Sequence, residues 1–260
     1  MKTYKLLKQS AVALVLVGLG VSTTSVFAAD GGVYESNGSV EFIPSTDPVS
    51  PVDPENPDPE NPVTPIDPTD PTGPNPGTAG PLSIDYASSL DFGKNKITNK
   101  DQTYFAKAQG FSEGAIKDEF RGNYVQVTDN RGTNAGWTLS LKQEGQFTSA
   151  TAKQYKELTG AKITLADSVA DSESVGVAAP TVTNVTLDPS GASTVIMAAK
   201  TGDGAGTWVD RFGQAEEMTI DGENVQKNKA VTLEIPGKTP KEAAQYTTKL
   251  TWTLTDVPGN

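Results

Sequence analysis

The chain has 260 residues, a formal net charge of −11, and neither histidine nor cysteine. The missing residue types exclude Ser-His-Asp and Cys-His catalysis, ordinary zinc sites and disulfide bonds. The acidic balance makes nucleic acids and anionic membrane surfaces poor partners. A glycosidase with two carboxylates needs no histidine, but the acidic residues here form no motif that singles out a pair. We therefore expect a binding protein without a metal or cofactor, not an enzyme.

The N-terminus has the pattern of a secretory signal peptide. Three lysines fall within the first eight residues, an apolar run follows over residues 11–19, and the small-residue pattern Val26-Phe27-Ala28 ends the segment. The run is far shorter than the ~20 residues that span a bilayer, which disfavours the alternative of an uncleaved anchor. We predict a signal peptide over residues 1–28, cleaved after Ala28. The mature protein should then be secreted and carry no transmembrane segment.

Residues 29–81 differ in composition from the rest of the chain. They hold ten acidic residues and no basic residue, and 13 of the 18 prolines lie between Pro44 and Pro81. The stretch 53–57 is repeated directly over 58–62. Because proline fixes φ and donates no ladder hydrogen bond, this stretch predicts a disordered, solvated spacer; a ligand for a proline-recognition module is the alternative. Residues 39–43 alternate as a short strand would, and they either dock on a sheet edge of the main domain or stay free.

Residues 82–260 form the predicted main domain. Short runs of alternating apolar residues are separated by Gly, Asn and Asp clusters, which is typical of an all-β antiparallel sandwich or barrel. One short helix is expected over residues 151–158, with Gly160 near its C-terminal cap. The strands are expected at residues 82–86, 102–108, 124–128, 136–143, 162–165, 181–187, 193–199, 218–220, 230–235 and 245–255.

Two of these strands share a Trp-x-Leu motif. The first contains Trp137 and Leu139, and the second contains Trp252 and Leu254. In both, large apolar residues alternate with threonine or serine, so that one face of each strand should be buried.

The residues around both motifs resemble those of the WxL-domain family of cell-surface proteins from low-GC Gram-positive bacteria. The C-terminal copy fits the family pattern Tyr-x3-Leu-Thr-Trp-x-Leu-x3-Pro from Tyr246 to Pro258, and the first copy lies in the family-like stretch 127–139. The resemblance covers residues 82–260 and also the order of signal peptide, proline-rich segment and domain. It implies that the motif residues Trp137, Leu139, Trp252 and Leu254 are needed for binding.

The sequence leaves open how these residues act. Trp137 and Trp252 are either core residues or rings that stack on a ligand. Trp208 lies in a Gly-rich stretch over residues 202–212 that predicts a loop, where Asp210 and Arg211 could add polar contacts. Arg131 either contacts a ligand or pairs with a nearby aspartate. Tyr246, from the second motif, is a further candidate contact.

The expected function follows from the resemblance. It implies non-covalent attachment to the cell wall, with peptidoglycan as the anchor, either directly or through companions of the same system. These companions are a membrane-anchored WxL-interacting protein and a larger WxL protein. Non-covalent attachment also fits the residues, because no cysteine can carry a lipid and no Leu-Pro-x-Thr-Gly sorting signal follows Pro258. The alternative is an adhesin for host matrix proteins such as collagen or fibronectin.

Overall fold

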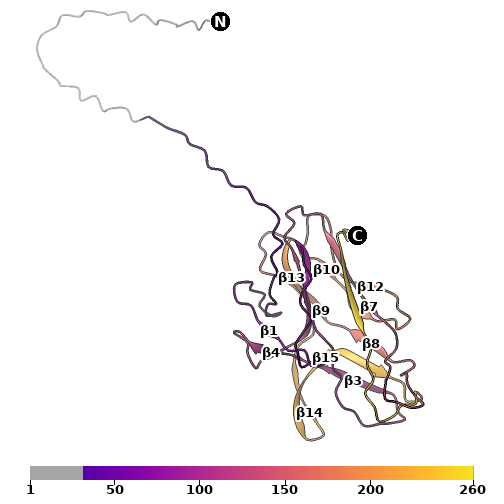
Figure 1. Ribbon diagram of the computed structural model, residues 1–260. Helices are drawn as coiled ribbons and strands as arrows, with labels where there is room; N and C mark the ends of the chain where they lie inside the picture. Colours follow the sequence, from indigo (N-terminus) through magenta and orange to yellow (C-terminus); the bar gives the residue numbers. More distant parts are fainter. Residues whose placement is uncertain (1–31, 260) are drawn as a thin grey trace, which may run out of the picture. The chain divides into compact units, whose positions relative to one another are not determined.

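The computed structural model describes residues 32–259, and the chain divides into two units that meet between Glu41 and Phe42. The predicted signal peptide, residues 1–28, lies outside the described residues. Residues 32–41, the described part of the first unit, form no strand. The second unit consists of short antiparallel strands joined by turns (Figure 1). Within residues 32–259 no helix is long and apolar enough to cross a membrane.

The strands form four antiparallel sheets. The first sheet runs in the order β2 (Leu82–Ala87), β6 (Asn123–Asp129), β13 (Gly206–Phe212) and β9 (Ser168–Asp171). The second runs in the order β10 (Thr181–Val182), β12 (Thr194–Ala199), β7 (Trp137–Gln143) and β16 (Leu250–Thr255). The third contains β11 (Val185–Thr186), β8 (Lys162–Leu165), β15 (Glu223–Ile235) and β14 (Glu216–Ile220), with β3 (Gln102–Lys107) also paired to β15. The fourth contains β1 (Thr64–Pro65), β4 (Gln109–Glu113) and β5 (Phe120–Arg121).

The all-β antiparallel prediction is confirmed, but the predicted sandwich is wrong. Four short sheets, arranged more like the blades of a four-bladed propeller than like two facing layers, build the unit. β15 has a register shift between Asn228 and Thr232, where its pairing with β3 is interrupted. Such irregularities bend strands and increase their local twist.

The expected strands are present, because each of the ten predicted segments contains a strand of the structure. The predicted helix over residues 151–158 is wrong. Thr148 forms β-bridges with both Glu157 and Thr247, and the Glu242 carboxylate accepts the backbone N–H groups of residues 153–155. These tertiary partners hold the segment in a turn. The predicted loop over residues 202–212 is also wrong, because most of it forms β13, in the interior of the first sheet.

Residues 44–81, which we call the proline-rich strap, lie against the domain instead of forming the predicted solvated spacer. Val52 and Val63 are buried in an apolar cluster with Phe111. The backbone N–H of Val52 donates to Gln126 Oε1 at 2.8 Å, and β1 of the strap pairs with β4. A proline-rich chain offers few donors, so carbonyl groups, prolines and single valines make most of this contact.

An ion-pair cluster fastens the same strap. Arg121 on β5 donates from Nε and Nη2 to the two carboxylate oxygens of Asp53 at 3.1 and 3.2 Å. Glu55 lies 3.4 Å from Nε, and Glu119 lies 2.7 Å from Nη2. The Arg121 side chain is only 16% exposed. A fork-shaped guanidinium that is largely shielded from water and bound by three carboxylates fixes the strap in one position.

The short strand expected over residues 39–43 is absent. These residues are extended but form no ladder, and the side chains of Val40, Phe42 and Ile43 are 77–89% exposed.

Candidate functional site

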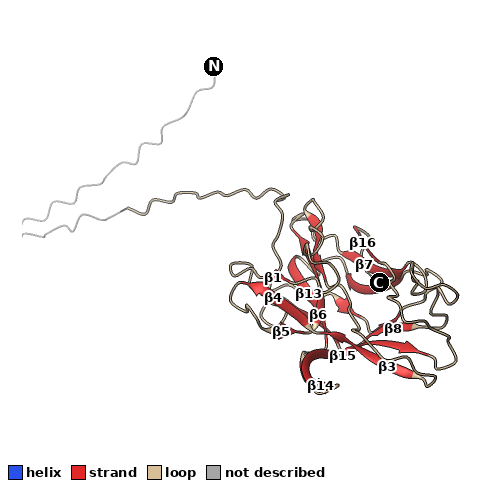
Figure 2. Cartoon of the chain, turned by 60° about the horizontal axis from the view of Figure 1, so that its bottom comes forward, coloured by secondary structure: helices blue, strands red, loops and turns tan. Residues whose placement is uncertain are grey.

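The two Trp-x-Leu motifs lie side by side in the second sheet (Figure 2). β7 and β16 pair antiparallel, with Trp252 opposite Leu141 and Leu254 opposite Leu139. More than a hundred residues of sequence therefore separate two halves of one ribbon, which we call the motif ribbon (Trp137–Gln143 and Leu250–Thr255).

The first motif is part of the core. Trp137 and Leu139 have no exposed surface, and the Trp137 indole N–H donates to the carbonyl oxygen of Gly204 at 2.9 Å. Gly204 has φ +71°, and a Cβ atom there would lie 2.9 Å from the indole nitrogen. The ring thus fits against a backbone turn that only glycine accommodates easily. Trp137 supports the fold and has no surface to offer a ligand.

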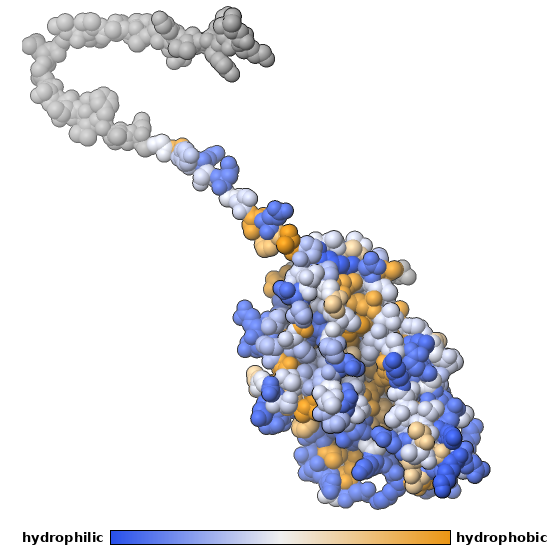
Figure 3. All heavy atoms as spheres, viewed as in Figure 1, coloured by the Kyte–Doolittle hydropathy of each residue, from blue (hydrophilic) through white to orange (hydrophobic). Residues whose placement is uncertain are grey.

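The second motif lies at the edge of the same sheet. β16 has β7 as its strand partner on one side and no strand of the described residues on the other. Trp252 and Leu254 are half-buried, and Trp252 packs against two apolar clusters at once. Apolar surface runs down the middle of the second unit in Figure 3, over the region where Figure 1 draws β7, β12 and the yellow C-terminal strand. This copy of the motif therefore combines packing with partial access to solvent.

The outer face of the motif ribbon consists of hydroxyl side chains and Lys142. Thr253 and Thr255 are exposed, and Thr138, Ser140 and Thr251 are half-buried. Their cross-strand register places Thr253 opposite Ser140 and Thr255 opposite Thr138. The Thr138 hydroxyl donates to the carbonyl oxygen of Val257 at 2.8 Å, and the hydroxyls of Ser140 and Thr255 donate across the ribbon to carbonyl oxygens at 3.4 Å. Their oxygens can still accept hydrogen bonds, so this face offers a row of polar groups above an apolar underside.

Tyr246 positions the loop that leads into β16. Its hydroxyl donates to the carbonyl oxygen of Tyr155 at 2.6 Å and accepts the backbone N–H of Glu242 at 3.0 Å. Its ring packs against the apolar cluster that contains Leu141. Both polar roles of the hydroxyl are already used within the domain.

The proposed contacts near Trp208 are buried. Trp208 is 5% exposed and donates from its indole nitrogen to the carbonyl oxygen of Ala205 at 3.0 Å. Asp210 has no exposed surface and accepts a hydrogen bond from Ser168 Oγ at 2.5 Å. Its second carboxylate oxygen has no partner, and burial raises the pKa of Asp210 to about 7. Burial leaves neither side chain available for the loop contact expected from the sequence.

Both candidate arginines have local partners. Arg131 donates from Nε and Nη2 to the carboxylate of Asp129 at 2.9 and 2.7 Å, and from Nη2 to the carbonyl oxygen of Gly136 at 2.8 Å. The Asp129 hydrogen bonds raise the pKa of Arg131. Arg131 therefore follows the alternative of a pair with a nearby aspartate and fixes the turn before β7. Arg211 donates to the carbonyl oxygen of Gly213.

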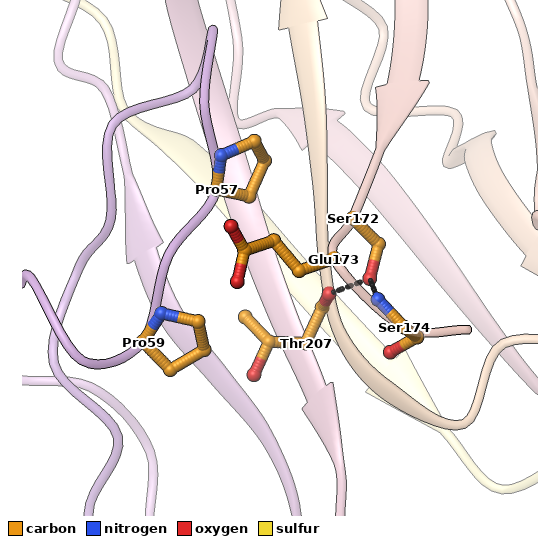
Figure 4. A pocket seen from close by; sticks show the side chains of 6 residues that line it. All are labelled: Pro57, Pro59, Ser172, Glu173, Ser174 and Thr207. Carbon is orange, nitrogen blue, oxygen red and sulfur yellow. Dashed lines mark hydrogen bonds between the residues drawn. The ribbon is translucent and has the colours of Figure 1, made fainter.

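Two hollows of the second unit lie beside the strap. A small pocket of about 40 Å³ lies where Glu173 reaches between Pro57 and Pro59 of the strap, and Ser172 Oγ there donates to the carbonyl oxygen of Thr207 (Figure 4). A larger hollow of about 530 Å³ runs along the strap beside Asp85. The Asp85 carboxylate already accepts hydrogen bonds from Ser83, Gln126 and Thr128. Among residues 32–259, no three acidic side chains cluster as metal ligands would.

Comparisons with known proteins agree with the motifs. Residues 29–258 match the family model described as "WxL domain surface cell wall-binding". The comparison with curated proteins found no match, and the comparison with solved structures also found none. The matched span includes both Trp-x-Leu strands, the proline-rich strap and the residues that precede it. The description of the family is one of wall binding and surface association, not of catalysis. Because the family model matches most of the chain, the chain belongs to the WxL family of surface cell wall-binding domains.

Proposed function

We propose that the protein is secreted and attaches non-covalently to the peptidoglycan of a Gram-positive cell wall through the outer face of the motif ribbon. Membership in a wall-binding family over residues 29–258 is the observation that carries this proposal. The two motif tryptophans hold the ribbon from beneath: Trp137 is buried, and Trp252 is half-buried between two clusters. The hydroxyl row of Ser140, Thr253 and Thr255 then forms the contact surface.

The chemistry of this face suits a polysaccharide. Glycan chains present hydroxyl and amide groups that need donors and acceptors in return. The exposed Thr253 hydroxyl can supply both, and the oxygens of Ser140 and Thr255 can accept hydrogen bonds. The ribbon also carries little charge on this face, with Lys142 paired to Glu144 at 2.8 Å. A neutral face does not depend on attraction to the anionic groups of a wall. Attachment through a WxL-interacting protein is the other route to the same location.

Co-sedimentation with protein-free peptidoglycan sacculi tests the proposal. The chain from Ala29 onward should sediment with the sacculi, and the double variant Thr253→Val, Thr255→Val should lose most of this binding. Valine keeps the branched shape and the strand propensity of threonine but removes the hydroxyl groups. The matched control is Thr219→Val on β14, another exposed threonine at a sheet edge, which should sediment like the unchanged chain.

Other outcomes assign the attachment elsewhere. If the unchanged chain stays in the supernatant, direct recognition is refuted, and sedimentation that appears only with an added WxL-interacting protein ectodomain makes that protein the anchor. If the valine variants sediment fully, the ribbon face is not the contact surface. Binding to immobilised collagen or fibronectin without binding to sacculi would instead support the adhesin alternative.

A further inference from the structure

The open side of β16 is an unprotected sheet edge. The backbone N–H of Glu144 donates to the carbonyl oxygen of Lys249 at 2.9 Å, which makes these two residues a hydrogen-bonded pair. In an antiparallel ladder such pairs alternate, so the backbone groups of Leu250, Trp252 and Leu254 point away from β7. No charged residue or proline interrupts the edge between Leu250 and Thr255. Natural proteins normally guard such an edge with charge, proline or a covering segment.

Two other edges of the second unit are guarded. The strap covers β2, where the N–H of Thr78 donates to the carbonyl oxygen of Ile84 and the N–H of Ile84 donates back to Thr78 Oγ1, each at 2.8 Å. The edge strand β14 carries the charged residues Glu216 and Glu217. β16 instead presents six consecutive uncharged residues at its edge, whereas the uncharged edge strands β10 and β11 have two residues each. This length suits β16 to accept a further strand.

A segment whose sequence alternates as a strand would lies exposed near the N-terminal end of the matched span. Residues 39–43 are extended, and Val40 and Phe42, which would lie on one face of a strand, are 77% and 89% exposed. The family match begins at residue 29, so this segment belongs to the matched domain. Large apolar side chains that lie exposed together are typical of a site of interaction with another protein surface.

We propose that residues 39–43 of one copy add as a strand to the open edge of β16 in a second copy. Backbone hydrogen bonds would provide the affinity, as in other cases of strand addition. Val40 and Phe42 would then lie beside Trp252 and Leu254 on the apolar side of the sheet, and Glu41 would join the outer hydroxyl face. This assembly goes beyond the wall attachment proposed above, because it uses the edge of the ribbon and not its outer face.

The contact joins two different surfaces of identical chains. Each copy offers one free strand and one open edge, so the same contact can repeat from copy to copy. Open chains of copies or closed rings would result, and their size would rise with protein concentration.

Introduced cysteines test this arrangement cleanly, because the chain has none of its own. One preparation carries Glu41→Cys and a second carries Thr253→Cys, and the two are mixed and treated with a short bismaleimide. We expect a cross-linked dimer of the two preparations. The matched control replaces the second preparation with Thr219→Cys on the guarded edge β14, which should give at least tenfold less cross-linked product.

Further variants decide between the outcomes. The double variant Val40→Asp, Phe42→Asp should abolish the cross-link. It should also abolish the rise of the sedimentation coefficient with protein concentration. The circular dichroism spectrum of the protein should stay unchanged. Equal cross-linking to Thr253→Cys and Thr219→Cys would overturn the proposal. The proposal would also be overturned by a chain that carries both Glu41→Cys and Thr253→Cys and forms only intramolecular cross-links, at low and at high protein concentration. Failure of wall binding would leave these readouts unchanged, so the two proposals can fail separately.

Discussion

The two motif tryptophans should contribute unequally to stability, although they occupy the same position of the same sequence pattern. Trp137 is fully buried, and its indole N–H bonds to the buried carbonyl of Gly204. Replacing a buried tryptophan by alanine costs about 3–5 kcal/mol, and the orphaned carbonyl adds about 1–3 kcal/mol. Trp137→Ala should therefore lower the free energy of unfolding by about 5 kcal/mol or more, a large part of the 5–15 kcal/mol typical of a domain.

Trp252 should cost less. It is half-buried at the sheet edge, and its indole N–H makes no hydrogen bond within the described residues. Scaling the cost of a buried tryptophan by this partial burial gives a loss of about 2 kcal/mol for Trp252→Ala. The ring still packs against two clusters, so the loss should not be negligible.

Urea unfolding followed by far-ultraviolet circular dichroism measures both values. Fluorescence is unsuitable because the chain has only three tryptophans and each variant removes one. Trp137→Phe serves as an internal control: it keeps an aromatic ring and should lose about 1–3 kcal/mol for the missing hydrogen bond. Equal losses for the two alanine variants, or a larger loss at Trp252, would refute the division into a core copy and an edge copy.

Three further predictions concern the supports of this arrangement. Arg121→Ala should release the strap, which lowers the free energy of unfolding by about 1–3 kcal/mol and speeds amide hydrogen exchange at residues 50–63. The control Lys96→Ala should change the free energy of unfolding by less than about 0.5 kcal/mol, because the ion pair of Lys96 with Asp221 is exposed. Gly204→Ala should lower the free energy of unfolding by about 2–4 kcal/mol, because the new Cβ would meet Ala199 and Trp137. The control Gly202→Ala, with φ +96° and open space around the new Cβ, should lower it by only about 1 kcal/mol. Equal losses in melting temperature would contradict this prediction. Burial raises the folded-state pKa of Asp210 from its ordinary 3.8 to about 7, so its neutral form stabilises the fold at low pH and this contribution is lost as the pH rises through about 7. Asp210→Asn should flatten this fall in urea-unfolding stability between about pH 4 and pH 8.

Local sequence patterns predicted strands whose apolar and polar residues alternate. β7 is the clearest case, with buried residues strictly alternating from Trp137 to Gln143. β13 was missed because its sequence does not alternate: Trp208 and Val209 are adjacent, and the glycines before them favoured a loop. Burial on both faces is not the cause, because β6 is buried at every residue and was still predicted from its alternating sequence.

The position of the strap could not be read from the proline content. Proline-rich composition predicts an extended chain, whereas the strap also makes turns closed by the backbone hydrogen bonds of Asn56, Asn61 and Gly73. Composition also does not tell whether a surface exists to receive it. That surface is formed by Phe111, Ile116 and Tyr124, which are distant in sequence from Val52 and Val63. The pairing of β7 with β16 is equally non-local, so the motifs were predicted while their adjacency was not.

The docked strap also changes which part of the chain should be tested. A fragment that begins at residue 82 keeps both motifs but loses Val52, Val63 and β1, and it leaves Phe111 without its cover. Such a fragment could fail to bind the wall simply because the fourth sheet is incomplete. Wall binding must therefore be measured on the chain from Ala29 onward.

The role of each Trp-x-Leu copy depends on whether its strand lies inside the sheet or at its edge. An interior strand has neighbours on both sides, so β7 uses Trp137 and Leu139 only for packing. An edge strand has one neighbour, so the same pattern in β16 leaves Trp252 and Leu254 partly accessible and the backbone groups of one side unpaired. Loss of binding after mutation of the first motif would then follow from loss of folding. Loss of binding in a well-folded variant of β16 would identify the surface that meets the partner.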